Sequence, residues 1–129
     1  KKIKNIQVHK NLGRNDYYGI MNLFKKNLGV CIGNSSSGIK ETPAFHIPAI
    51  DIGSRQKNRL CAKNIIKANY NKIEIINAIQ KAMSNKFRNY CKKIKNPYGI
   101  RSPGPKIAKI LSKIEIDKKL IQKKMTIKF

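Results

Sequence analysis

The sequence has no tryptophan, only 3 cysteines, and only 6 acidic residues against 29 basic ones among its 129 residues. Cys31, Cys61 and Cys91 are odd in number and lack the CxxC or Cys/His spacing of a zinc site, which excludes a disulfide framework and a sequence-encoded metal site. We expect all three to be reduced, small core residues, because no His or acid stands in position to support a catalytic thiol.

Long hydrophobic runs are also absent. The longest apolar stretches, such as residues 28–32, fall far short of the roughly 20 residues that a membrane-spanning helix needs. No apolar segment with a small-residue cleavage site follows the N-terminal lysines, so we expect a cytoplasmic protein without a membrane partner. The chain begins Lys1-Lys2-Ile3 without an initiator Met, and we interpret it as one piece of a longer chain that holds a single domain.

The formal net charge is +23, which taken alone indicates a polyanionic partner. Only five of the basic residues are Arg, and the chain is equally rich in Ile and Asn, which share A/T-rich codons with Lys. Compositional drift in a genome would therefore give the same charge. The lysines are scattered along the chain and do not cluster with stacking aromatic residues, so a nucleic-acid-binding module is the disfavoured alternative to a solvated basic surface.

The first half of the chain predicts a βαβ pattern. Imperfect alternation favours a strand over residues 3–8, and Tyr17, Ile20, Met21 and Phe24 share one face of a helix that begins at Asn15 or Asp16 and ends near residue 27. The apolar run 28–32 is typical of a strand covered on both faces. A helix-compatible segment over 39–45 and a strand over 48–52 follow, which together indicate an α/β fold with a parallel sheet.

The second half of the chain is dominated by helical spacing. Apolar residues recur at intervals of three and four over residues 72–94 and predict the longest helix, and a Pro/Gly-rich loop follows over 96–105. A shorter helix places Ile107, Ile110, Leu111 and Ile114 on one side. We predict a domain over residues 1–114 and a Lys-rich tail over 115–129, which is either helical or frayed.

A polar loop, Gly33-Asn34-Ser35-Ser36-Ser37-Gly38, lies where a predicted buried strand passes into a helix. In open α/β sheets ligands bind at the carboxyl ends of the strands, and a helix N-terminus there offers free N–H groups to an anion. Gly38 would let the backbone approach a phosphate, and the serine hydroxyls would add donors. Ordinary helix capping explains the same residues equally well.

Three charged residues are expected near this loop. Glu41 lies in the first turn of the following helix, where a carboxylate either interacts with the helix dipole or accepts hydrogen bonds from ribose hydroxyls. Arg55 and Arg59 lie in the loop after the next strand, and Arg55 is the better diphosphate candidate because it follows the strand end directly. His9 and His46 are interpreted as loop histidines and not as catalysts.

These segments resemble the paired motifs of UDP-N-acetylglucosamine 2-epimerases, most closely the hydrolysing branch. The residues that carry the resemblance are Gly33 to Ile39 with Glu41 and Pro43, Ile47-Pro48, and Ile52-Gly53-Ser54-Arg55-Gln56-Lys57-Asn58-Arg59. Leu12-Gly13-Arg14 with Tyr17, and Asn96-Pro97-Tyr98-Gly99, fall in the family's order, so the resemblance covers most of residues 11–111. The sequence departs from the pattern at His46, Ser54, Asn58 and Ile100-Arg101.

The resemblance implies an incomplete Rossmann-like lobe, the second half of a two-lobed enzyme of the glycosyltransferase-B type, with UDP in the cleft between the lobes. It assigns Ser35, Ser36 and Gly38 to the diphosphate, Glu41 to the ribose and Arg55 to the phosphates, with Ser37, Asn34 and Arg59 as further candidates. The implied reaction removes the C2 proton, eliminates UDP, and adds water to give a C2-inverted free sugar such as N-acetylmannosamine for sialic-acid-type biosynthesis.

Further expectations follow from the same resemblance. The catalytic acid and base would lie in the N-terminal lobe, so no catalytic residue is assigned to this chain, and the chain alone is expected to be inactive. The expected partners are a UDP-sugar, the missing lobe and further copies of the full-length enzyme, with no cofactor and no metal. A two-lobed sugar-nucleotide glycosyltransferase remains an alternative.

Overall fold

The computed structural model describes residues 5–99 and 102–122, and these residues form a small α/β fold with a tail of two short helices. The elements are α1 Gly13–Lys26, β1 Cys31–Gly33, α2 Ser36–Lys40, α3 Thr42–Phe45, β2 Ala49–Ile52, β3 Ile65–Ala68, α4 Lys72–Met83, α5 Asn85–Cys91, α6 Gly104–Leu111 and α7 Lys118–Ile121. No helix within the described ranges is long and apolar enough to cross a membrane.

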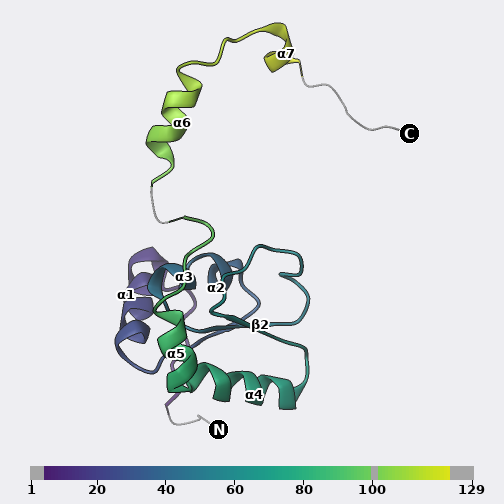
Figure 1. The fold of residues 1–129 in the computed structure, drawn as a ribbon. Helices are drawn as coiled ribbons and strands as arrows, with labels where there is room; N and C mark the ends of the chain where they lie inside the picture. The colour runs from purple at the N-terminus through teal and green to yellow at the C-terminus, as the bar shows by residue number, and fades with distance from the viewer. Residues whose placement is uncertain (1–4, 100–101, 123–129) are drawn as a thin grey trace, which may run out of the picture.

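The three strands form one parallel sheet in the order β1-β2-β3, which confirms the predicted α/β class. Cys31 lies opposite Ala49, and Ala49 lies opposite Ile65. Helix α4 covers one side of the sheet, and helices α1, α2 and α3 lie on the other side (Figure 1). Because all three strands run in the same direction, the loops that follow them meet at one edge of the sheet.

The core lies between the sheet and α4. Ile50 and Ala68 of the sheet pack with Ala78 and Ala82 of the helix, and all four are almost fully buried. The large apolar residues of this helix do not share one buried face: Ile75 and Ile79 pack against the core, whereas Ile73 is 68% exposed. Small alanine side chains let the helix approach the sheet closely, and a pattern based on large residues alone does not weigh them.

Two strand predictions need correction. Residues 5–8 form no strand, and the rest of the predicted segment 3–8 lies outside the described residues. The run 28–32 yields only the short strand β1, which begins at Cys31 and lies at the edge of the sheet. Leu28 is 61% exposed and Ile32 is 46% exposed, so the strand is not covered on both faces within the described chain.

The helix predicted over residues 72–94 is in fact two helices. Ser84 has an extended backbone, with φ −67° and ψ 139°, and its hydroxyl accepts a hydrogen bond from the Phe87 N–H at the start of α5. Ser84 therefore ends α4 and caps α5, as serine does at helix starts. The segment 39–45 is likewise divided, into α2, which begins earlier than predicted, and α3.

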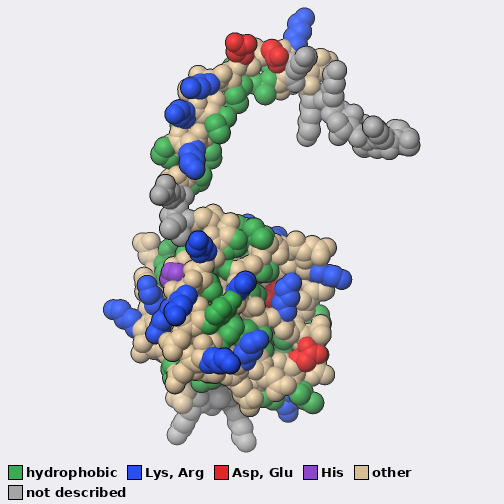
Figure 2. Space-filling model, in the orientation of Figure 1, with side chains coloured by type: hydrophobic (Ala, Val, Ile, Leu, Met, Phe, Trp, Pro, Cys, Tyr) green, Lys and Arg blue, Asp and Glu red, His purple; other side chains and the backbone are tan. Residues whose placement is uncertain are grey.

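The C-terminal part of the described chain makes little contact with the rest. The apolar residues of α6 and of the segment after it, Ile107, Ile110, Leu111, Ile114, Ile116, Leu120 and Ile121, are all at least 40% exposed. Figure 2 shows hydrophobic side chains along this arm and Lys and Arg side chains spread over the visible face of the main body. Within the predicted tail, Lys118–Ile121 form the short helix α7. Residues 123–129 lie outside the described residues.

Two of the positions at which the sequence departs from the family pattern have left-handed backbones. His46 has φ 57° and ends α3, and Asn58 has φ 66° in the loop after β2. Glycine adopts this conformation without the steric cost that a β-carbon brings, and Asn tolerates it better than most residues. These positions therefore keep a backbone that suits glycine. The departure at Ile100-Arg101 lies outside the described residues.

Candidate functional site

The serine-rich turn connects the carboxyl end of β1 to the start of α2. Strand β1 ends at Gly33, and Ser35 caps α2, its hydroxyl accepting a hydrogen bond from the Ser37 N–H at 3.3 Å. The first N–H groups of a helix have no partner within the helix, so this turn presents donors at the edge of the sheet. Ser35 therefore performs the capping role, and that role is compatible with an anion at the same helix end.

The three serine hydroxyls have different surroundings. The Ser37 hydroxyl donates to Glu41 Oε2 at 2.9 Å and also contacts the Tyr17 hydroxyl. Ser35 is engaged in the cap, whereas the Ser36 hydroxyl has no hydrogen-bond partner among the residues that the structure describes. Ser36 is thus the hydroxyl of this turn most free to bind a ligand.

The loop after β2 reaches the same turn. Arg55 Nη1 lies 3.5 Å from both the main-chain oxygen and Oδ1 of Asn34, at the outer limit of a hydrogen bond. Gln56 makes the firmer contact, because its Nε2 donates to the Asn34 main-chain oxygen at 2.7 Å and its side chain is 2% exposed. Gln56 therefore holds the two loops together and leaves the Arg55 guanidinium exposed beside them.

Glu41 and Arg55 contact opposite ends of one short segment, Asn34 to Ser37. Glu41 meets it through Ser37, and Arg55 meets it through Asn34. The exposed Arg59 makes no side-chain hydrogen bond to the described residues, and its main-chain N–H donates to the Gln56 oxygen. The structure thus brings six of the candidates, Asn34, Ser35, Ser36, Ser37, Glu41 and Arg55, around one turn and leaves Arg59 apart.

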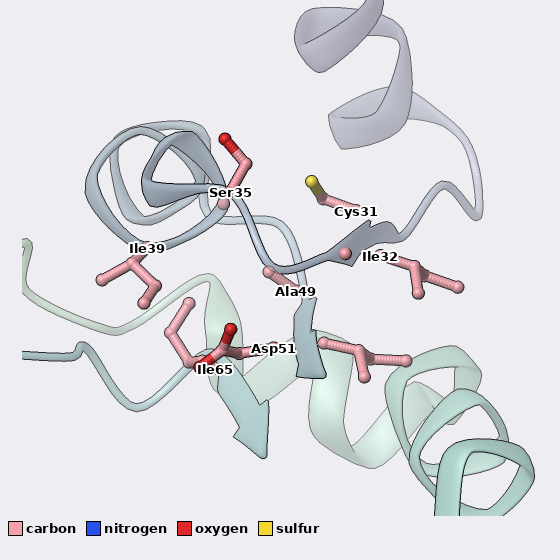
Figure 3. A pocket seen from close by; sticks show the side chains of 10 residues that line it. Cys31, Ile32, Ser35, Ile39, Ala49, Asp51 and Ile65 are labelled. Carbon is pink, nitrogen blue, oxygen red and sulfur yellow. The ribbon is translucent and has the colours of Figure 1, made fainter. Parts of the chain in front are cut away.

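Gly38 lies behind this turn, against the sheet. A β-carbon at this position would lie 3.8 Å from Cys31 Sγ, which is an ordinary contact, so packing within the described residues does not require glycine here. Gly38, Cys31 and Asp51 border a small hollow of about 30 Å³ between α2 and the sheet (Figure 3). Burial raises the pKa of the Cys31 thiol, and the nearby Glu41 adds to this effect, so the thiol is protonated and unreactive at neutral pH.

Two residues of this site were not among the predicted ones. Tyr17 lies on a predicted helix face and in a motif without an assigned role, yet its hydroxyl contacts Ser37. Burial raises the pKa of Tyr17. The sequence places Gln56 in a motif and predicts no role for it. The position of Gln56 directly after Arg55 could have indicated a buried side chain, because neighbouring loop residues point in different directions and one of them can turn inward. Within residues 5–99 and 102–122, no three His, Cys, Asp or Glu side chains group to hold a metal ion.

Comparison with known proteins bears on this geometry. The chain is similar to the UDP-N-acetylglucosamine 2-epimerase of Neisseria meningitidis serogroup B, with 49% identity over 53 residues, or 41% of this chain and 14% of the relative. It is 44% identical over 78 residues to the GDP/UDP-N,N'-diacetylbacillosamine 2-epimerase (hydrolyzing) of Campylobacter jejuni, which covers 60% of this chain and 19% of that protein.

A third relative is the UDP-N,N'-diacetylbacillosamine 2-epimerase (hydrolyzing) of Legionella pneumophila, 28% identical over 97 residues, or 75% of this chain and 25% of the relative. The chain therefore spans between 14% and 25% of the length of these relatives. The profile of one family, described as UDP-N-acetylglucosamine 2-epimerase, matches residues 1–112. Because this match covers most of the chain, the protein belongs to the UDP-N-acetylglucosamine 2-epimerase family.

Proposed function

We propose that this chain forms the UDP-binding part of a hydrolysing 2-epimerase. The whole enzyme would convert UDP-N-acetylglucosamine, or a diacetylated UDP-sugar, into UDP and a C2-inverted free sugar such as N-acetylmannosamine. The observation that carries the proposal is the grouping of Ser36, Glu41 and Arg55 around one helix-start turn in a chain of this family. Two of the similar proteins have hydrolysing diacetylbacillosamine epimerase names, which favours the hydrolysing branch.

The turn suits a diphosphate for electrostatic reasons. The N-terminus of α2 offers unpaired N–H groups, Ser36 offers a free hydroxyl, and Arg55 offers a guanidinium at the same edge of the sheet. Elimination of UDP increases the negative charge on the diphosphate as the bond to the sugar breaks. Fixed donors around that charge stabilise the leaving group more than the substrate, which is how such a site would accelerate the reaction.

Glu41 suits the ribose. Its Oε2 accepts the hydrogen bond from Ser37, and its Oε1 has no hydrogen-bond partner among the described residues. A carboxylate oxygen that is held by one neighbour and otherwise free can accept hydrogen bonds from the 2′- and 3′-hydroxyls. Ser37 then acts as a positioning residue, which orients Glu41 without needing to touch the nucleotide.

The diphosphate assignment is tested with a matched pair of arginine variants. Arg55→Gln and Arg59→Gln each remove one positive charge from the same loop, but only Arg55 contacts the serine-rich turn. We expect Arg55→Gln to weaken UDP binding by about tenfold or more, and Arg59→Gln by less than about threefold, as measured by isothermal titration calorimetry. Equal losses in the two variants would mean that only general charge attraction is at work.

The ribose assignment is tested with Glu41→Gln and two nucleotides. If Glu41 accepts hydrogen bonds from the ribose, the wild-type chain should bind UDP more tightly than 2′-deoxy-UDP. Glu41→Gln should then reduce that preference, because the amide accepts these bonds less strongly. An unchanged ratio of the two dissociation constants would place the ribose elsewhere.

The activity itself calls for two further measurements. We expect the 129-residue chain alone to release no UDP from UDP-N-acetylglucosamine, since no catalytic acid or base is assigned to it, and release of UDP would contradict this division of labour. Titration with duplex DNA at two salt concentrations tests the nucleic-acid alternative, because binding to a phosphate backbone weakens steeply with salt whereas a specific UDP site weakens far less.

A further inference from the structure

A second pocket lies at the carboxyl ends of β2 and β3, and Asp51 is the one lining residue that it shares with the hollow beside the serine-rich turn. Its volume is about 340 Å³, within the roughly 300–1,000 Å³ that small-molecule sites occupy. Its lining includes Asp51, Ser54, Lys57, Lys67 and Asn69. The residues assigned above to UDP do not border this pocket, so its polar lining has no role in the proposed function.

The most informative member of this pocket is Asp51. Its side chain is only 5% exposed, and its Oδ1 has no hydrogen-bond partner among the described residues. Lys67 lies directly opposite in the register of β2 and β3, yet no hydrogen bond joins the two side chains. An unpartnered buried carboxylate oxygen costs free energy. Because Oδ1 is itself closed to solvent, a ligand hydroxyl in the pocket would donate to Oδ2, which also has no hydrogen-bond partner among the described residues.

An aromatic ring lies beside one lining residue of the pocket. The ring of Tyr70 lies directly against Gly53, because a β-carbon added at Gly53 would come within 2.1 Å of Tyr70 Cζ. Gly53 lines the pocket and has φ 82°, a backbone that favours glycine. One side of the Tyr70 ring is thus held against the main chain, while the side chain as a whole remains 75% exposed. Aromatic rings with one free face are suited to the apolar face of a sugar.

We propose that this pocket binds a sugar that carries an anionic group, as a site separate from the UDP site. The ammonium groups of Lys57 and Lys67 would hold the anion, Asp51 and Asn69 would bind sugar hydroxyls, and the Tyr70 ring would cover one face of the sugar. A phosphate and a carboxylate would serve this site equally well as the anionic group. The proposal does not depend on the identity of the epimerase substrate.

The test uses the 129-residue chain and follows main-chain NMR shifts. The probes are glucose 6-phosphate and glucuronate, with glucose and inorganic phosphate as comparison ligands. We expect saturable shifts at residues 53–54 and 67–69 with at least one anionic sugar, and binding at least about tenfold weaker for glucose and for phosphate alone. Comparing glucose 6-phosphate with glucuronate shows whether the site prefers a phosphate or a carboxylate. If inorganic phosphate binds as tightly as the two anionic sugars, the proposal is overturned.

Three variants complete the test. Lys67→Gln and Tyr70→Ala change exposed side chains, and each should weaken binding of the anionic sugar by about fivefold or more while leaving UDP binding unchanged. Lys25→Gln removes the same charge from exposed α1 and should have no effect. An equal loss in Lys25→Gln, or competition between UDP and the anionic sugar, would refute a separate site. Failure of UDP to bind the wild-type chain would bear only on the proposed function.

Discussion

Replacing Arg88 by Met should loosen the connection that leads into the candidate site. Arg88, half-buried in α5, donates from Nη1 to the Gly29 oxygen at 2.9 Å, and from Nη2 to the Asn27 oxygen at 2.5 Å and the Phe24 oxygen at 3.2 Å. One guanidinium thus satisfies three carbonyl groups at the end of α1 and in the turn before β1. Methionine keeps the apolar stem of the side chain and removes every donor.

The expected loss follows from these contacts. A hydrogen bond from a charged donor contributes about 1.5–3 kcal/mol net, and less where water can replace it. The contact with Gly29 is part-buried and short, the contact with Phe24 is longer, and the contact with Asn27 is exposed, so we count the first in full and the others in part. The free energy of unfolding of Arg88→Met should therefore fall by about 2–4 kcal/mol, a large share of the 5–15 kcal/mol typical of a domain.

Urea denaturation followed by circular dichroism measures this change directly. Lys92→Met is the matched control, because Lys92 lies one turn further on and its side chain donates only to Asn89, at 3.1 Å; it should change stability by less than about 0.5 kcal/mol. Arg88→Lys should be intermediate, since a single ammonium group reaches fewer carbonyls. If Arg88→Met proves as stable as the Lys92 control, the three contacts contribute nothing net and the reasoning fails.

Three smaller predictions concern stability. Asn64→Leu should cost about 2–3 kcal/mol in urea denaturation, because fully buried Asn64 donates to the Ile47 oxygen at 2.7 Å and leucine leaves that carbonyl unpaired. At His46 and at Asn58, alanine variants should be about 1 kcal/mol less stable than glycine variants, and equal stability would show that the left-handed backbone carries no cost. Burial raises the pKa of Asp51 above its ordinary 3.8, so protonation favours the folded state, and stability should fall as the pH rises from about 4 through the raised pKa. Asp51→Asn should abolish that part of the pH dependence, and an unchanged profile would mean that another group titrates.

Much of the fold could be predicted where one local pattern decided the outcome. The βαβ order and the helix that became α1 follow from hydrophobic spacing and from the polar loop after β1. Strand β3, by contrast, was not predicted, because its four residues include Lys67 and show no regular alternation of apolar and polar side chains. Such a strand forms because β2 supplies a partner in register, and that partner is not encoded in the segment itself.

The errors in the helical half have a different cause. Apolar spacing continues from α4 into α5, so periodicity alone predicted one helix, whereas the local preference of Ser84 for a cap ended it. On α4, the fully buried contacts with the sheet come from Ala78 and Ala82, with Ile75 and Ile79 partly buried beside them, whereas Ile73 faces outward. In both cases a small residue decided the structure, and small residues add little to a hydrophobic pattern.

The site shows what sequence motifs convey and what they omit. Motif residues located the turn and the two charged side chains beside it. The motifs also contain Gln56 and Tyr17, but they do not predict that the buried Gln56 amide joins the two loops or that the Tyr17 hydroxyl contacts Ser37. These residues act through contacts between segments that are distant in sequence, 22 positions apart for Gln56 and Asn34. Spacing within one motif does not encode such contacts, so residues that position a site are harder to predict than those that touch the ligand.

Both proposed ligand sites follow from the same parallel register. Because β1, β2 and β3 run in one direction, the three loops after them open at one edge of the sheet, and each adjacent pair of strands creates its own crevice there. The turn after β1 and the loop with Arg55 form the first crevice, and the loop after β2 with Lys67 and Asn69 forms the second. Asp51, on the central strand, lies between them and borders both hollows. Asp51 is the one lining residue that the two hollows share, so a ligand in the second crevice would leave the turn after β1 open for UDP.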